Sequence, residues 1–236
     1  MKMLKLAFWM ACVFAAQTSA QEGINLSWDD CGSYGVSNKQ FACDTNVGAD
    51  VLVVSFRVNT PLPDFIGAQA ILSVRGSSAL PDWWKHYAGF AVMPCRDTLG
   101  LESDLANTSC PYPYLNPALH SAYAGPSNQP EAARLQGLSG QNPTATLAAG
   151  VEFAAVRILI THHKTVGPSP CPGCQEPVCI VLNEVELYQY AGSPPPTRLT
   201  TPIERNYVTW QSTLPLCPAS TPARSGTWGA IKSMYR

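Results

Sequence analysis

An even set of cysteines behind an export signal constrains this chain more than any other feature. Residues 1–20 carry Lys2 and Lys5, an apolar run from Leu6 to Ala16 and a small-residue cleavage site at Thr18-Ser19-Ala20, which together predict a secretory signal peptide. Of the nine cysteines, Cys12 lies in this signal, and eight follow it: Cys31, Cys43, Cys95, Cys110, Cys171, Cys174, Cys179 and Cys217. An even number in an exported chain predicts a disulfide framework. We therefore expect a secreted or cell-surface protein.

Charge and hydropathy argue against two classes of partner. Charged residues make up 13% of the chain, the formal net charge is -1, and no basic cluster is visible. The usual charged share is ~25%. Binding to nucleic acid therefore has no electrostatic basis. No apolar run after residue 20 approaches the ~20 residues of a membrane span, so we expect no membrane span.

The apolar pattern has the period of β-strands. Apolar residues alternate over Ile24–Trp28, whereas Val51–Val58 is a continuous β-branched run, typical of a central strand. Further strands are predicted over Ile66–Val74, Glu152–Thr161 and Val178–Tyr190, and weaker ones over Ala132–Gly137 and Asn206–Gln211. Many strands separated by Gly/Pro turns predict an all-β fold, an antiparallel β-sandwich of the immunoglobulin-like or jelly-roll type.

Three segments are expected along the chain. The signal peptide occupies residues 1–20, and the disulfide-stapled β-sandwich occupies residues 21–191, with a proline-rich insertion from Cys95 to Pro130. Residues 192–236 form a proline linker and a C-terminal tail. Within the tail, Trp228, Ile231 and Tyr235 recur with helical spacing, which predicts a short helix that docks on the sandwich or on a neighbouring subunit.

The pairing of the cysteines is expected to be local. Cys31–Cys43 and Cys95–Cys110 would each close a short loop rich in turn residues. The remaining four cysteines allow three pairings, of which we favour Cys171–Cys174 with Cys179–Cys217. The alternatives stay open from sequence alone.

The same cysteines suggest other chemistry that the sequence does not favour. Cys171-Pro172-Gly173-Cys174 has the spacing of a redox motif, but Pro177 and the β-rich run after it leave no helix N-terminus to activate a thiol. A zinc site with His163 would leave an odd number of cysteines. Calcium at Asp29, Asp30, Asp44 or Asp50 lacks a D-x-D-x-D-G loop. We expect neither a metal nor a cofactor.

A ligand surface is most strongly indicated at Trp83, Trp84 and Tyr87. Aromatic rings in a loop can stack on sugars or on a protein partner. The alternative is that the tryptophans fill the end of the core, and because neighbours in an extended segment face opposite ways, one ring could serve each purpose. Catalysis has weaker support: the sequence has no G-x-S-x-G or H-E-x-x-H motif. Glu184 and Glu186 lie two residues apart on one strand face, so their Cα atoms are roughly 6.5–7 Å apart, a separation that a glycosidase pair could tolerate.

Several segments of the chain are similar to known sequences. They include Ile24–Gly32, Leu80–Trp84, the C-x₂-C-x₄-C-I-V-L-N block from Cys171 to Asn183 and the T-W-G-x-I-K-S-x-Y-R ending. These resemble a set of uncharacterised secreted proteins predicted from environmental bacterial genomes. The resemblance implies export, bacterial origin and a shared fold, and carries no activity.

The sequence therefore predicts a secreted or cell-surface binding or structural module that is not an enzyme. Its partner would be a carbohydrate or another extracellular protein, and a homo-oligomer is compatible with the tail. Two alternatives remain. One is a secreted hydrolase acting on carbohydrate or peptide, and the other is a subunit of an extracellular filament or envelope assembly.

Overall fold

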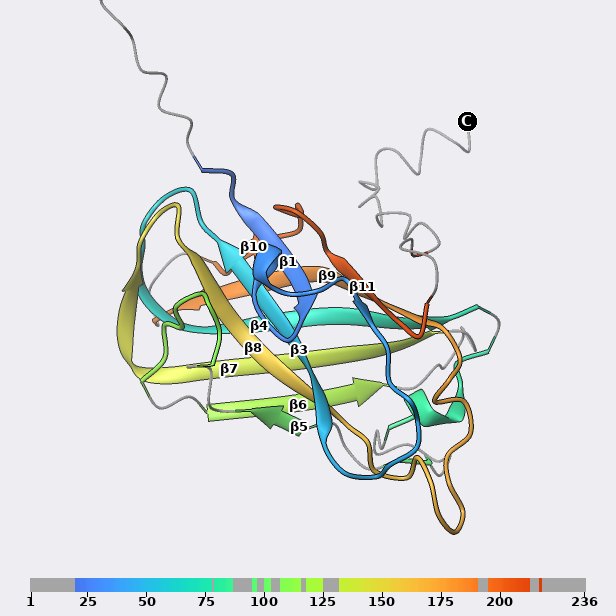
Figure 1. Cartoon of the computed structure of the whole chain (residues 1–236). Helices are drawn as coiled ribbons and strands as arrows, with labels where there is room; N and C mark the ends of the chain where they lie inside the picture. Colours follow the sequence, from blue (N-terminus) through green and yellow to red (C-terminus); the bar gives the residue numbers. More distant parts are fainter. Residues whose placement is uncertain are drawn as a thin grey trace, which may run out of the picture.

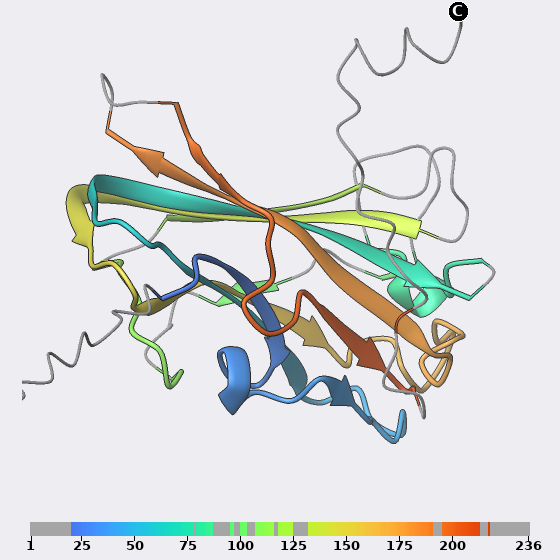
Figure 2. The ribbon, with the colours of Figure 1, turned by 90° about the horizontal axis from the view of Figure 1, so that it is seen from above.

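Two β-sheets face each other across a shared core (Figures 1 and 2). The structure is a computed structural model, and it describes residues 20–77, 79–86, 95–96, 100–102, 107–115, 118–124, 132–190, 195–212 and 217. Within these residues one sheet has four strands and the other has seven. In Figure 2 the long strands β4 and β7 of the larger sheet lie above the strands of the smaller one.

The four-stranded sheet is antiparallel throughout. Its order is β1 (Gly23–Trp28), β3 (Ala49–Arg57), β8 (Glu152–Thr161) and β5 (Gly100–Glu102). The alternating apolar residues of β1 point into the core, where Ile24, Leu26 and Trp28 are fully buried. On the other face Asn25 accepts a backbone hydrogen bond from Glu204 at 2.9 Å. The segment after β10 therefore covers the outside of β1.

The larger sheet carries the longest strands. Its order is β2 (Asn38–Lys39), β11 (Tyr207–Trp210), β9 (Val178–Gln189), β4 (Leu62–Gly76), β7 (Ala132–Leu147) and β6 (Ala118–Ala124), and β10 (Thr197–Leu199) also pairs with β9. All of these pairs are antiparallel except β2 with β11. On β4 the residues Ala68, Ala70, Leu72 and Val74 face the core, while Gln69 and Ser73 face outward, as their alternation predicts.

The fold is all-β, and the strands predicted from the apolar pattern are confirmed. The only helical elements among the described residues are two 3₁₀ turns, η1 (Gly32–Tyr34) and η2 (Asp82–Trp84). Neither is long enough to cross a membrane. The short strands β2 and β10 were missed, and so were β5 and β6, which lie in the segment predicted as an insertion. β5 and β6 form edges of the two sheets. Short, alanine-rich β6 gives little alternation signal, because its pairing with β7 is decided by the tertiary structure.

The domain boundary expected at residue 191 is wrong. Two strands that follow it, β10 and β11, pair with β9, and Val208 and Trp210 of β11 are fully buried in the core. The sheet therefore continues past the proline linker, because β11 supplies apolar residues that cover the end of β9. Most of the expected signal peptide, and the expected helix with Trp228, Ile231 and Tyr235, lie outside the described residues.

All eight cysteines form disulfides, but mostly not with the expected partners. The bonds are Cys31–Cys110, Cys43–Cys174, Cys95–Cys171 and Cys179–Cys217. The last was predicted; the local pairs Cys31–Cys43, Cys95–Cys110 and Cys171–Cys174 are wrong. The first three bonds join cysteines 79, 131 and 76 residues apart, with Cα atoms 5.7–6.1 Å from each other. Pairing follows which loops the sheets bring together, not which cysteines are neighbours in the sequence.

Candidate functional site

The Trp83-Trp84 segment lies in the core, as the alternative of core-filling tryptophans predicted, and not on a ligand surface. Both residues belong to η2 and are 0% and 1% exposed. Trp83 stacks on Trp210 with ring centroids 5.1 Å apart, and Trp84 meets the same ring edge-on at 5.6 Å. Both rings are buried because a 3₁₀ turn, unlike a strand, does not send neighbouring side chains to opposite faces. The expected platform at Trp83 and Trp84 is therefore wrong, and Tyr87 lies outside the described residues.

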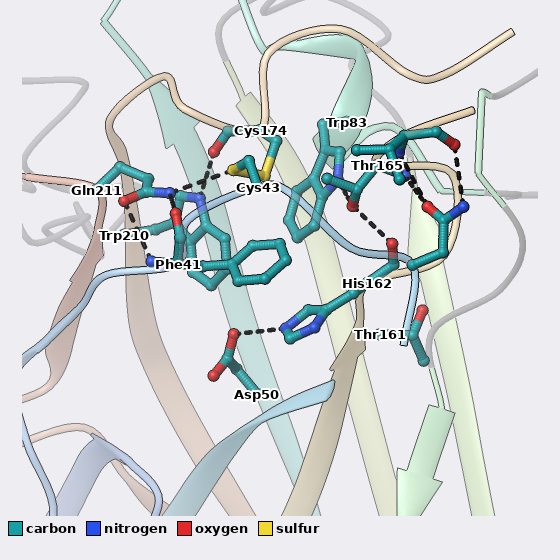
Figure 3. The surroundings of a disulfide bond; sticks show 12 residues. Phe41, Cys43, Asp50, Trp83, Thr161, His162, Thr165, Cys174, Trp210 and Gln211 are labelled. Carbon is teal, nitrogen blue, oxygen red and sulfur yellow. Dashed lines mark hydrogen bonds and ion pairs between the residues drawn. A yellow bond between two sulfur atoms is a disulfide. The ribbon is translucent and has the colours of Figure 1, made fainter. Parts of the chain in front are cut away.

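Polar contacts hold these tryptophans in place (Figure 3). Trp83 Nε1 donates to Thr165 Oγ1 at 2.9 Å, and Trp210 Nε1 donates to the carbonyl oxygen of Cys174 at 2.7 Å. The guanidinium of Arg96 lies 3.9 Å from the centre of the Trp83 ring, within the range of a cation–π interaction. We call the cluster of Trp83, Trp84 and Trp210, with Thr165, Arg96 and the Cys43–Cys174 bond beside it, the tryptophan end. Its contacts are internal, which is the mark of a structural region.

His162 contributes to the tryptophan end. Its Nε2 lies 2.9 Å from Asp50 Oδ2, its Nδ1 lies 2.9 Å from the Val47 carbonyl oxygen, and its ring stacks on Phe41 at 3.7 Å between centroids. Lys39 Nζ is also 3.1 Å from Asp50. Because both ring nitrogens are engaged, His162 holds two loops together and offers no nitrogen to a metal or substrate.

Three of the four aspartates considered as calcium ligands, Asp29, Asp30 and Asp50, take other partners. Asp29 pairs with Lys39 at 2.7 Å. Asp30 accepts backbone N–H groups from Cys31 and Ser109, both at 2.7 Å. Burial opposes ionisation of Asp30, but these hydrogen bonds and that of the Ser109 hydroxyl outweigh it and lower the pKa of the carboxyl group. Among the described residues no three His, Cys, Asp or Glu side chains cluster as metal ligands.

An open hollow on the outer face of the seven-stranded sheet is the site that the structure adds. It has a volume of about 400 Å³ and lies over β4, β6, β7 and β9. Its lining is mostly apolar, with a few polar side chains: Ile66, Gly67, Gln69, Ala118, Leu119, His120, Leu138, Ser139, Gly140 and Tyr188. Volume and lining are typical of a small-molecule site. We call this region the sheet-face hollow.

Strand register explains why the sheet is hollowed at this point. Gly67 of β4 pairs with Gly140 of β7, and their outer neighbours in the same row are Tyr188 of β9 and Ala118 of β6. The two facing glycines leave the centre of the row without side chains, and Ala118 adds only a methyl group at its end. Tyr188 therefore forms one wall over a floor made largely of backbone.

The next row along the same face is polar and crosses five strands. In register order it runs through Arg198, Glu186, Gln69, Leu138 and His120, on β10, β9, β4, β7 and β6. Leu138 is 36% exposed, and the His120 side chain is also exposed. This row forms the ridge that borders the glycine row.

Tyr188 is tied down to this ridge. Its hydroxyl lies 2.7 Å from Gln69 Oε1 and 2.7 Å from Glu186 Oε2. Burial first, and then the hydrogen bond and negative charge of Glu186, raise the pKa of Tyr188 to about 12. Tyr188 is consequently a neutral hydrogen-bonding group at any physiological pH.

The paired carboxylates of β9 are both held by one arginine. Arg198 Nη2 lies 2.5 Å from Glu186 Oε1, and Arg198 Nη1 lies 3.9 Å from Glu184 Oε2. A general acid needs a carboxyl group that keeps its proton near neutral pH. Both carboxylates of this pair are instead engaged by the same guanidinium.

A sequence signal for the hollow existed, but its meaning depends on register. An isolated glycine inside a predicted strand suggests a bulge or a close backbone approach, and Gly67 is such a residue, whereas Gly140 lies beyond the strand predicted over Ala132–Gly137. Only the pairing of β4 with β7 shows that the two glycines face each other. Comparison of the chain with protein-family models and with curated proteins finds no match.

Proposed function

We propose that this protein is a secreted or cell-surface binding module that holds its ligand in the sheet-face hollow and does not catalyse a reaction. The export-signal pattern supports the location, as do four disulfides, which persist in oxidising compartments. The observation that carries the function is the hollow itself: about 400 Å³ of open, mostly apolar space over a glycine pair.

The strand order supports an immunoglobulin-like sandwich over a jelly roll. Immunoglobulin-like domains have the orders A-B-E-D and G-F-C in their two sheets. Assigning A to G in chain order to β1, β3, β4, β5, β8, β9 and β11 reproduces both orders. In this reading β6 and β7 are additions beside strand C. Since one fold hosts many functions, the proposed activity rests on the hollow and not on this likeness.

Local energetics favour a functional role for Gly140. Glycine inside a strand is destabilising by roughly 0.5–1 kcal/mol relative to alanine, because it loses more conformational freedom on folding. A Cβ atom on Gly140 would come no closer than 3.6 Å to its nearest neighbour, the Ile66 carbonyl oxygen, and Gly140 does not have a positive φ. The backbone does not require glycine at position 140, so backbone geometry does not account for the space that the missing side chain leaves on the sheet.

The hydrolase alternative has less support from the same face. The carboxylates of Glu184 and Glu186 share Arg198. Among the described residues, those that line the hollow include no cysteine and no carboxylate, and their one serine, Ser139, faces inward. Ser139 is fully buried and its hydroxyl bonds Tyr114 and the Ala155 carbonyl oxygen. These contacts leave the face suited to holding a ligand.

Filling the hollow tests the proposal. Gly140→Val adds a side chain that suits a strand and occupies the floor. Gln136→Val on the same strand faces outward but does not line the hollow, and it is the matched control. We would screen a library of small neutral, acidic and basic compounds by NMR, and expect hits to perturb β4, β6, β7 and β9 in the wild type and in Gln136→Val.

The expected result is that these hits are lost in Gly140→Val while its melting temperature stays close to that of the wild type. Hits that persist in Gly140→Val, hits that map elsewhere, or no hits would contradict the proposed site. Turnover of chromogenic glycoside or peptide substrates by the wild type would contradict its non-catalytic character.

A further inference from the structure

We infer that the ligand of the sheet-face hollow is a neutral saccharide of one or two pyranose units, lying over the glycine floor against the Tyr188 ring. The inference rests on the proposed function and names the chemical class of its ligand. Three features of the hollow carry it: its charge, its shape and the placing of its polar groups.

Charge comes first. Among the residues that the structure describes, those that line the hollow include no lysine, arginine, aspartate or glutamate. The nearest carboxylate in the bordering ridge, Glu186, is paired with Arg198 at 2.5 Å and accepts a hydrogen bond from Tyr188. An acidic or basic ligand would therefore find no countercharge to replace its lost hydration. An uncharged ligand avoids this cost.

Shape favours a flat ring over a rounded group. A row of three strand spacings of about 4.8 Å separates Tyr188 on β9 from Ala118 on β6, roughly 14 Å between backbones. The two central positions of this row are Gly67 and Gly140, so the floor is wide and shallow. One or two pyranose rings laid flat match such a trough, whereas an acyl chain gains more from a deep, enclosed cavity.

The Tyr188 ring supplies the aromatic surface for the proposed ligand. It lines the hollow, and its hydroxyl reaches Glu186 two residues back on β9 and Gln69 on the neighbouring strand, both at 2.7 Å. These contacts fix the hydroxyl end of the ring at the border of the hollow. The C–H face of a pyranose is the apolar surface of a sugar that stacks on an aromatic ring.

Polar groups border this apolar floor as sugar hydroxyls require. The Gln69 side-chain amide lines the hollow and lies 2.7 Å from the Tyr188 hydroxyl. The exposed His120 imidazole lies in the same row, beyond Leu138. An apolar floor with a few hydrogen-bonding groups at its border suits a ligand with an apolar face and a polar rim.

The experiment compares ligand classes at one site. Titration calorimetry would use tetrasaccharides of glucose, xylose, mannose and N-acetylglucosamine as neutral probes, with the galacturonic acid tetrasaccharide and octanol as acidic and apolar probes. Variants are Tyr188→Ala, Tyr188→Phe, Gln69→Leu and Gly140→Val, with Gln136→Val as the control.

We expect at least one neutral tetrasaccharide to bind, and Gly140→Val to abolish its binding. Tyr188→Ala should weaken binding roughly tenfold or more, and Tyr188→Phe should weaken it less because the ring remains. Gln69→Leu should weaken it through a lost hydrogen bond.

The outcomes separate the two proposals. Binding of galacturonate or octanol that Gly140→Val abolishes, with no neutral saccharide bound, would overturn the saccharide inference and leave the hollow as a binding site. Saccharide binding that survives both Gly140→Val and Tyr188→Ala would overturn both. Failure of every probe to bind would overturn the saccharide inference, and the compound screen would then decide the proposed function.

Discussion

The tryptophan end and the sheet-face hollow are opposites in composition and in use. At the tryptophan end, large rings and the Cys43–Cys174 bond fill the space between loops, and the indole N–H groups of Trp83 and Trp210 donate to acceptors within the protein. In the hollow, Gly67 and Gly140 leave space unfilled on a regular sheet, and exposed side chains border it. The tryptophan end has the aromatic residues that suggest binding in a sequence, whereas the sheet-face hollow has the open geometry of a binding site.

Aromatic residues therefore indicate a binding site only where the fold leaves them exposed. Trp83 and Trp84 bury a large apolar area, and that gain draws them into the core. The hollow forms because side chains are missing, and missing side chains give no hydrophobic signal in a sequence. The predictions below test this contrast.

The largest effect is expected from the disulfide at the tryptophan end. Replacing Cys43 and Cys174 together with serine opens a loop of 131 residues, and the chain-entropy model puts the loss at roughly 5 kcal/mol of unfolding free energy. Urea denaturation measures it. Cys179→Ser with Cys217→Ser opens a loop of 38 residues and should cost less, roughly 4 kcal/mol. Non-reducing peptide mapping that joined Cys31 to Cys43 would contradict the long-range pairing.

Both tryptophans of η2 should matter about equally to stability. Trp83→Ala and Trp84→Ala each remove a fully buried ring and leave a cavity, so each should lower the free energy of unfolding by about 3–5 kcal/mol. Tyr34, which is 73% exposed, provides the control: Tyr34→Ala should change stability by less than about 0.5 kcal/mol. A tolerated substitution at either tryptophan would mean that its ring is not part of the core.

The two glycines of the hollow should respond in opposite directions to alanine. A Cβ atom on Gly67 would lie 2.5 Å from the Ser139 carbonyl oxygen, so Gly67→Ala must displace the paired strand and should cost about 1–3 kcal/mol. Gly140→Ala meets only an ordinary contact at 3.6 Å and should stabilise by about 0.4–1 kcal/mol through a less flexible unfolded chain. Thermal denaturation compares them. Equal destabilisation by the two variants would reject this reading of the floor.

The smallest effect is a pH dependence of stability at the hollow. The pKa of Tyr188 is raised to about 12 by burial and by Glu186, so the unfolded chain releases this proton at lower pH than the folded one. Its contribution to stability is fully present below the unfolded pKa of about 10 and is lost as the pH rises through 12. Buried Tyr114, whose pKa is also raised, adds a loss of the same sign.

Ultraviolet absorbance of the phenolate follows this titration. Tyr188→Phe should remove one late-titrating group, and Glu186→Gln should lower the midpoint of Tyr188 because it removes the neighbouring negative charge. An unchanged midpoint in Glu186→Gln would show that the carboxylate does not act on the phenol.

Much of the fold could be predicted from the sequence, and little of the candidate site. β1 was visible because its apolar residues alternate with a period of two, and β8 because it is a nearly continuous apolar run. Short strands such as β6 at the sheet edge and β10 after the proline linker were not, since their pairing depends on partners elsewhere in the fold. The hollow was missed for the same reason: it depends on the register between β4 and β7.

The sequence by itself determined the strand-rich composition and an even set of cysteines behind an export-like segment, because apolar period and residue counts are local properties. The tertiary structure alone decided which cysteines pair, where the tryptophans lie and which residues meet on the outer face. Cys171 and Cys174 show the reason: they are three residues apart, yet they bond to Cys95 and Cys43 on different loops. Contacts of this kind are set by the packing of whole sheets, in which each pairing depends on all the others.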